Sequence, residues 1–125
     1  MNAEELRNIK VGEYIRCSGS IGIRKVKEVL KDLKTLNVKG VKDEKDLIIR
    51  IEFIQKHNKN ILKLIEKGDL VNGYIITSEY ITPDGTILRD SYERNDRLTK
   101  LKVNEVKTIL TRGQIEAKEY TVRGD

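Results

Sequence analysis

His57 and Cys17 carry the side chains best suited to catalysis or metal binding, and the chain has only one histidine and one cysteine. A catalytic histidine needs a partner that orients it, and a structural zinc site needs four ligands. These two residues lie far apart in the sequence. Arg16 beside Cys17 would favour a thiolate, but no neighbouring histidine is present to activate it. We therefore expect a structural Cys17, an exposed His57 and no metal site.

Other catalytic patterns are also missing. The carboxylates alternate with lysines, as in the run 42–46, and no pair has the spacing of a shared site. Gly19 and Gly22 are not followed by the lysine and hydroxyl residue of a phosphate-binding loop. No serine stands in a nucleophile elbow. The sequence predicts a protein that is not an enzyme and needs no cofactor.

A group of tyrosines and arginines is the first candidate binding surface. Both residue types anchor protein interfaces and stack on nucleic-acid bases. The partner-binding candidates are Tyr80, Arg89, Tyr92, Arg94 and Arg97. The alternative is that these tyrosines are half-buried sheet residues and that the arginines pair with acidic neighbours along the chain.

A basic stretch in the N-terminal half is the second candidate. The net charge is +5, with 15 basic and 10 acidic residues through Glu66 and 10 of each after it. A positive ridge along one strand would suit a phosphate backbone. The nucleic-acid-binding candidates are Arg24, Lys25, Lys27, Lys31 and Lys34. The alternative is a solvated face of spread lysines.

At 125 residues the chain has the length of one domain, 1–125, and can bury a core without disulfides. A single cysteine fits a reducing cytoplasm, and no apolar run has the length of a membrane span. We expect a cytoplasmic protein without a membrane partner.

The pattern of apolar residues predicts an α+β fold that is mainly antiparallel sheet. Exposed hairpin edges would also permit a homodimer. We expect β-structure in a hairpin over 9–30 that turns at Ser18-Gly19-Ser20, a strand over 47–54, a hairpin over 74–94 that turns at Thr82-Pro83-Asp84-Gly85 and a closing strand over 120–122. The second run of the first hairpin also fits a helix, with Ile23, Val26, Leu30 and Leu33 at helical spacing, but we favour a strand through Val29. We expect two short helices, one over 60–67 that Asn60 caps and Gly68 ends, and one over 104–111 that breaks at Thr111. The fold is expected to be an SH3-like small barrel or two β-modules.

Two segments have the same pattern. Val11–Ile15 and Lys67–Val71 each place a glycine and an acidic residue before two apolar residues. The pattern is typical of a tandem pair of modules, 1–56 and 57–125, but also of any strand that begins after a glycine.

The second half resembles small accessory proteins encoded by phages and prophages of Firmicutes. Those proteins have a His-Ser-Lys-Asn-Ile segment before a Leu-Ile-Glu-x-Gly-Asp-x-Val-Asn-Gly core. Here the segment is His57-Asn58-Lys59-Asn60-Ile61, and the core is Leu64-Ile65-Glu66-Lys67-Gly68-Asp69-Leu70-Val71-Asn72-Gly73. The tail over 102–122 is also similar, with Arg112, Gly113 and Ile115 as departures.

The resemblance implies an accessory protein of a mobile element that acts inside a bacterial cell. Many such proteins bind and block a host defence machine. The leading expectation is a non-enzymatic, anti-CRISPR-like inhibitor of a defence protein such as a Cas effector. The alternatives are a small β-barrel that binds nucleic acid and a sponge for a nucleotide signal.

Overall fold

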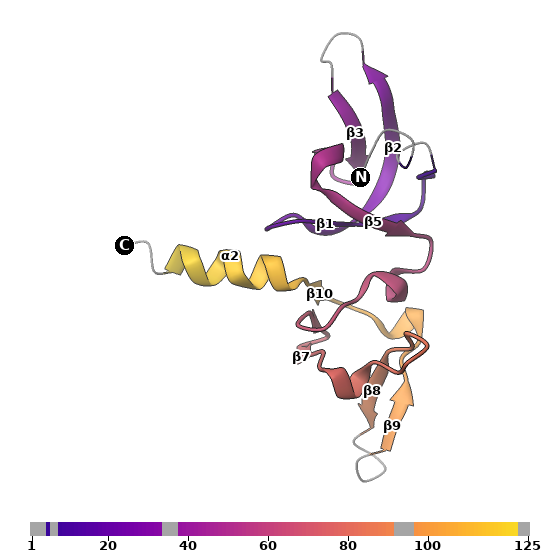
Figure 1. The fold of residues 1–125 in the computed structure, drawn as a ribbon, viewed down its shortest axis with the longest axis vertical. Helices are drawn as coiled ribbons and strands as arrows, with labels where there is room; N and C mark the ends of the chain where they lie inside the picture. The colour runs from indigo at the N-terminus through magenta and orange to yellow at the C-terminus, as the bar shows by residue number, and fades with distance from the viewer. Residues whose placement is uncertain (1–4, 6–7, 34–37, 92–96, 123–125) are drawn as a thin grey trace.

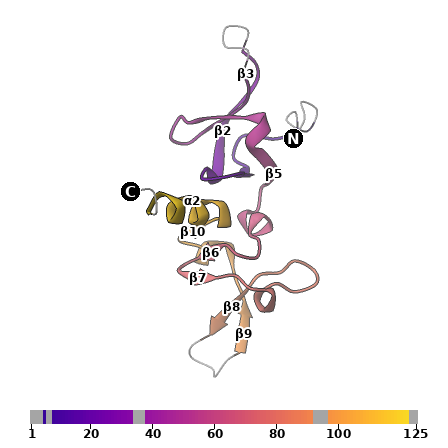
Figure 2. The same cartoon turned by 60° about the vertical axis from the view of Figure 1, so that its left-hand side comes forward.

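The computed structural model describes residues 5, 8–33, 38–91 and 97–122. These residues are mainly antiparallel β-structure in three open sheets, with one short helix and several 3-10 turns. Two lobes follow one another along the long axis of the molecule (Figures 1 and 2). We define the first lobe as residues 8–58 and the second lobe as residues 65–110. No sheet of the described residues closes into a barrel, so the barrel prediction is corrected to open sheets.

The first lobe is a five-stranded sheet in the order β4-β3-β2-β1-β5. Its strands are β1 (Tyr14–Cys17), β2 (Gly22–Leu33), β3 (Val38–Asp43), β4 (Ile48–Arg50) and β5 (Ile54–Asn58). The predicted N-terminal hairpin is confirmed as β1 and β2. Its buried side chains form one hydrophobic cluster in which Ile15, Val41 and Ile54 are almost completely enclosed.

The single strand predicted over 47–54 is wrong. Residues Ile51–Phe53 form a 3-10 turn that separates β4 from β5. The two strands lie at opposite edges of the sheet, so the chain must turn between them. The boundary expected between 56 and 57 therefore falls inside β5, where His57 pairs with Ile15 of β1.

The second lobe has two small sheets, in the orders β10-β6-β7 and β8-β9. Its strands are β6 (Leu70–Val71), β7 (Tyr74–Ile75), β8 (Leu88–Ser91), β9 (Arg97–Lys100) and β10 (Ile109–Leu110). A separate hydrophobic cluster fills this lobe and includes Ile76, Ile87 and Leu101.

The hairpin predicted over 74–94 does not form. Strand β7 pairs with β6 across a two-residue turn in which Asn72 and Gly73 have φ values of 51° and 85°. Asn-Gly with both φ angles positive is the preferred turn of a tight hairpin. The turn predicted around Pro83 does form, and within the described part of its arms the one β-bridge is between Ile81 and Ile87. Hydrogen bonds from Thr82 and Thr86 lower the pKa of Asp84 in this turn to about 2.

The helix predicted over 60–67 is shorter than expected. Asn60 caps it as predicted, because its Oδ1 accepts a hydrogen bond from the Leu62 N–H at 3.0 Å. The element is only a 3-10 turn, Ile61–Leu64. Gly68 does adopt a positive φ of 95°, but it leads into β6 rather than ending a helix.

The C-terminal elements reverse the prediction. The expected helix over 104–111 is a 3-10 turn at Val103–Glu105 followed by strand β10, and the expected break at Thr111 begins helix α2 (Arg112–Val122). Thr111 Oγ1 accepts from the Gln114 N–H at 3.3 Å, and Gln114 Oε1 accepts from the Thr111 N–H at 2.9 Å. This reciprocal capping box explains why a helix replaces the closing strand expected over 120–122. No described helix is long and apolar enough to span a membrane.

The two glycine-acid segments have the same local geometry. Each glycine has a φ near 95° and donates to the carbonyl of a residue that lies opposite it where the chain returns. The N–H of that same residue donates to the carbonyl of the acidic residue. Each carboxylate also accepts from the backbone N–H three residues before it. The glycines are Gly12 and Gly68, the acids Glu13 and Asp69, the paired residues Val26 and Ile76, and the N–H donors Lys10 and Glu66.

A buried ion pair joins the two lobes. Arg16 of β1 donates from Nη1 and Nη2 to the two carboxylate oxygens of Asp69, at 2.5 and 2.9 Å. Its Nη1 also donates to the Leu64 carbonyl at 2.9 Å. Burial alone would lower the pKa of Arg16, but the hydrogen bonds and charge of Asp69, with the charge of Glu66, raise it above its usual value. The guanidinium therefore stays charged inside the protein.

Helix α2 makes a second connection between the two lobes. Strand β10 pairs with β6 of the second lobe, and α2 then lies beside the β1–β2 turn of the first (Figures 1 and 2). A Cβ on Gly113 would overlap the backbone carbonyl of Gly19. The helix can approach this closely only because position 113 is a glycine.

We expect the Asp69→Asn substitution to destabilise the protein strongly. It keeps the side-chain shape but removes the only buried counter-charge described for Arg16 and leaves the partly exposed Glu66 carboxylate, 3.5 Å from Arg16 Nε. The free energy of unfolding should therefore fall by ~3 kcal/mol in urea denaturation. Glu66→Gln is the matched control, because the Glu66 side chain is 37% exposed and should cost less than about 1 kcal/mol. Equal losses in the two variants would contradict this role for Asp69.

We expect Gly113→Ala to reverse the usual order of helix propensity. Alanine in a helix normally adds about 1 kcal/mol of stability over glycine. Here the contact with Gly19 should instead cost ~1–3 kcal/mol as α2 is pushed from the first lobe. Glu116→Ala, at an exposed position of α2, should be nearly neutral. Stabilisation by Gly113→Ala would show that the helix does not dock as described.

Candidate functional site

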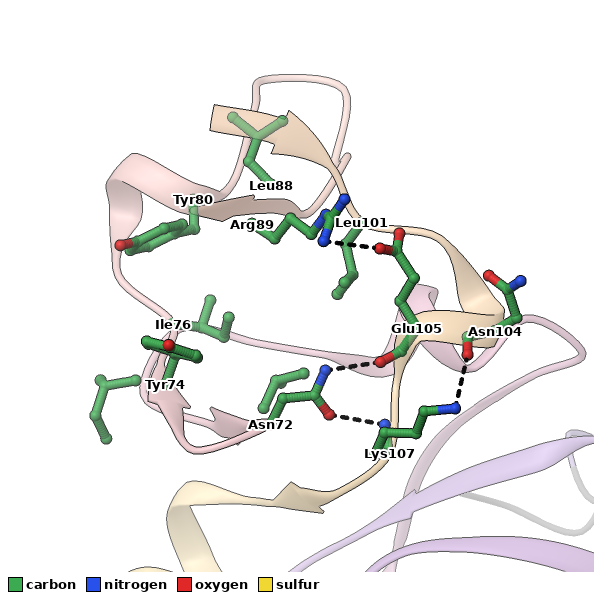
Figure 3. A pocket seen from close by; sticks show the side chains of 12 residues that line it. Asn72, Tyr74, Ile76, Tyr80, Leu88, Arg89, Leu101, Asn104, Glu105 and Lys107 are labelled. Carbon is green, nitrogen blue, oxygen red and sulfur yellow. Dashed lines mark hydrogen bonds and ion pairs between the residues drawn. The ribbon is translucent and has the colours of Figure 1, made fainter. Parts of the chain in front are cut away.

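A pocket of about 440 Å³ opens in the second lobe. Residues of β6, β7, β8 and the 3-10 turn Ser78–Tyr80 line it, together with the segment 101–107. The rings of Tyr74 and Tyr80 lie at one end, and Arg89, Glu105 and Lys107 lie at the other (Figure 3). The pocket thus has an aromatic end and a charged end.

The floor of the pocket belongs to the core of the second lobe. Val71, Ile76 and Leu101 all line the pocket, and each is at most 5% exposed as a residue. Beside them, Tyr74 and Ile75 are 48% and 51% exposed. Large apolar side chains that face water next to an apolar hollow are typical of a binding surface.

Asn72 holds in place the far wall of the pocket, which contains Glu105 and Lys107. Its Oδ1 accepts hydrogen bonds from the N–H groups of Lys107 and Thr108, at 2.7 and 3.1 Å. Its Nδ2 donates to the Glu105 carbonyl at 2.7 Å. The turn between β6 and β7 is thereby fastened to residues 105–108, so this side of the pocket is preformed.

Glu105 orients the arginine at the charged end. One carboxylate oxygen accepts from the Lys102 N–H at 2.8 Å, and the other lies 3.0 Å from Arg89 Nη1. Lys107 lines the same end, and its Nζ donates to the Asn104 carbonyl at 3.4 Å. Two cations and one carboxylate leave this end of the pocket with a net positive charge.

The structure places the five predicted partner-binding residues unequally. Tyr80 and Arg89 both line the pocket, as members of one surface. Tyr92 and Arg94 lie outside the described residues. Arg97 begins β9 and pairs with Ser91, while its side chain is not among those described. Sequence reasoning missed Asn72, Glu105 and Lys107, of which only Asn72 had a signal, the Asn-Gly turn.

The predicted basic ridge is largely paired with acidic residues. Arg24, Lys25 and Lys27 follow one another along β2 as expected. Their nitrogens lie 3.6, 3.8 and 2.6 Å from carboxylate oxygens of the turn after β3, in the order Asp43, Glu44 and Asp46. Lys31 is in β2 without a described side chain, and Lys34 lies outside the described residues. The three described cations are therefore partly neutralised.

A second hollow of about 290 Å³ lies where the two lobes meet. Arg24 and Lys25 of the first lobe and Lys107 of the second line it, with Tyr14 among its other lining residues. Lys25 Nζ is 5.8 Å from the centre of the Tyr14 ring. Because Arg24 and Lys25 already face carboxylates, this hollow is less suited to an anion than its lysines suggest.

His57 and Cys17 are both packed in the first lobe. His57 Nδ1 lies 3.2 Å from Glu13 Oε1 and its side chain is 24% exposed, so the expected exposed histidine is half-buried. Cys17 is a free cysteine of the core. Burial, with a smaller contribution from the charge of Asp43, raises its pKa to about 12, against the opposing effect of Arg24. Among the described residues, no group of three or more histidine, cysteine or acidic side chains could hold a metal ion.

Comparison of this chain with protein-family models, with curated proteins and with solved structures finds no match.

We expect Cys17 to be inert in the folded protein. With a pKa of about 12, almost none of it is thiolate at pH 8, and the thiol is buried. Iodoacetamide should label it only after unfolding in guanidinium, as followed by mass spectrometry. A Ser20→Cys substitution in a Cys17→Ala background places the thiol at an exposed position and should label rapidly without denaturant. Rapid labelling of native Cys17 would contradict its position in the core.

Proposed function

We propose that this protein is a non-enzymatic inhibitor, encoded by a phage or prophage, that binds a bacterial defence protein such as a Cas effector through the pocket of the second lobe. The observation that carries the proposal is the pocket itself, which Tyr80 and Arg89 both line together with the exposed Tyr74 and Ile75. The phage context comes from the sequence resemblance. The inhibitor would act by covering a surface that the defence protein needs, for example its nucleic-acid path.

The composition of the pocket favours a protein partner. Tyrosine and arginine are enriched among the residues that dominate binding energy at protein interfaces. Glu105 and Asn72 fix the charged end and the far wall before binding, which lowers the ordering cost of association. The floor of the pocket is apolar, and the carboxylate of Glu105 is already engaged with Arg89 and the Lys102 N–H.

The alternative of nucleic-acid binding has weaker support. A phosphate backbone is recognised by cations that can exchange their small counter-ions for phosphates. Arg24, Lys25 and Lys27 would first have to leave the carboxylates beside them. This cost makes β2 a less favourable nucleic-acid surface than the sequence alone indicates.

We expect Arg89→Glu to abolish capture of the defence protein. The tagged protein is incubated with nuclease-treated lysate of a CRISPR-bearing host, and captured proteins are identified by mass spectrometry. Reversing the charge of Arg89 at the charged end of the pocket should weaken binding by about 2 kcal/mol or more, roughly 30-fold. Because the Arg89 side chain is 52% exposed, the fold should tolerate the change.

Lys27→Glu is the matched control, with the same charge reversal at an exposed residue of the first lobe, 54% exposed. It should leave capture unchanged. A parallel capture uses lysate without nuclease. Recovery of nucleic acid there, with no protein captured from the nuclease-treated lysate and with sensitivity to Lys27→Glu, would overturn the proposal in favour of nucleic-acid binding.

A further inference from the structure

Strand β7 is an edge of its sheet that faces water beside the pocket. The sheet order β10-β6-β7 leaves one side of β7 without a neighbouring strand among the described residues. Ile75 on this strand is 51% exposed. An exposed edge strand is a template on which a further strand can pair.

The turn before β7 fixes which backbone groups point outward. A two-residue turn makes the flanking pair, Val71 and Tyr74, the hydrogen-bonded pair of the hairpin. The next pair, Leu70 and Ile75, is then a non-hydrogen-bonded pair, because the two kinds alternate in antiparallel sheets. The hydrogen bond from the Ile76 N–H to the Asp69 carbonyl, at 2.8 Å, continues the same alternation. The N–H and carbonyl of Ile75 are therefore directed away from β6.

The pocket lies next to this edge, and its lining favours both an apolar side chain and an acidic group of a ligand. Tyr74, Ile75 and Ile76 are all part of its lining, so a segment beside β7 would lie against the opening. The volume of about 440 Å³ can take a large apolar side chain, with Leu101 and Ile76 at the floor. At the other end, Lys107 and Arg89 exceed the single carboxylate of Glu105, which favours an acidic ligand group.

We infer that the ligand of this site is an extended segment of the partner protein that adds to β7 as a further strand. One large apolar side chain enters the pocket, and an acidic side chain lies close to Arg89 and Lys107. Backbone pairing would supply affinity, and the two side chains would supply specificity. This inference rests on the proposed function, because it names the chemistry that the same surface recognises.

The experiment is selection of a random heptapeptide library, displayed on phage, against the immobilised protein. The Arg89→Glu variant serves for counter-selection. Enriched peptides should contain an aromatic or large aliphatic residue together with Asp or Glu, and should lack Lys and Arg near it. Absence of enrichment over the variant, or a consensus without acidic residues, would overturn the inference.

Backbone methylation of the best peptide tests strand addition directly. Successive N-methyl groups are placed along the synthetic peptide, and the Kd is measured by fluorescence polarisation. A paired strand should lose at least tenfold in affinity at the one position whose N–H faces the Ile75 carbonyl and little at the positions on either side, because alternate N–H groups point away from β7. A uniform or absent effect would overturn the inference, and this readout leaves the protein unaltered.

Two further variants report on the protein side. Ile75→Pro removes the outward N–H and should raise the peptide Kd at least tenfold, whereas Ile75→Val keeps this N–H and should change it little. If Arg89-dependent capture of a defence protein succeeds but no peptide enriches, strand addition is wrong and the proposed function stands. If peptides bind as expected but no defence protein is captured, the strand site stands and the proposed function falls.

Discussion

The structure depends on the buried ion pair between Arg16 and Asp69. Both side chains are at most 5% exposed, and such burial is stable only when the lone pairs and protons of the pair are satisfied. Asp69 meets this condition, because its two oxygens accept from Arg16 twice and from the N–H groups of Glu66 and Arg112. The pair therefore sets where β6 begins relative to β1, and it also sets where α2 begins.

This constraint explains why two small hydrophobic clusters form a single molecule. Neither lobe has a large core, and the strands of the second lobe are two to four residues long. Asp69 directly precedes β6, and its carbonyl accepts from the N–H of Ile76, which directly follows β7. The hairpin β6–β7 is thus attached to the first lobe through the residue before β6. Residues of that hairpin line the pocket, so the position of the aromatic end of the pocket depends on the ion pair.

Local signals in the sequence predicted local structure well. The Ser18-Gly19-Ser20 turn, the cap at Asn60 and the turn at Pro83 each depend on a few adjacent residues, and all three form. The start of α2 was also encoded locally, since Thr111 and Gln114 have the spacing of a capping box. The glycine after Arg112 opposes that signal, because it also fits the helix break expected from Thr111 onward. Glycine there serves the contact with Gly19, which sequence does not reveal.

The sequence patterns do not predict which distant segments pair as neighbouring strands. The alternation over 47–54 is consistent with one strand, and nothing local shows that β4 and β5 belong to opposite edges of a sheet. The candidate site was only half predictable for the same reason. Tyr80 and Arg89 are recognisable by residue type. Glu105 and Lys107 are far from Asn72 in the sequence, and hydrogen bonds to Asn72 hold them at the pocket.

The distribution of ion pairs decides where the net charge of +5 can act. In the first lobe, Arg24, Lys25 and Lys27 face three carboxylates of one turn, so each has an acidic neighbour that offsets its charge. At the pocket, Arg89 shares its charge with Glu105, and the pocket-lining Lys107 has only the Asn104 carbonyl as a described partner. A carbonyl lowers the cost of holding a cation but does not cancel its charge. A carboxylate from another molecule therefore gains more at the pocket than along β2, although basic residues are more closely spaced along β2.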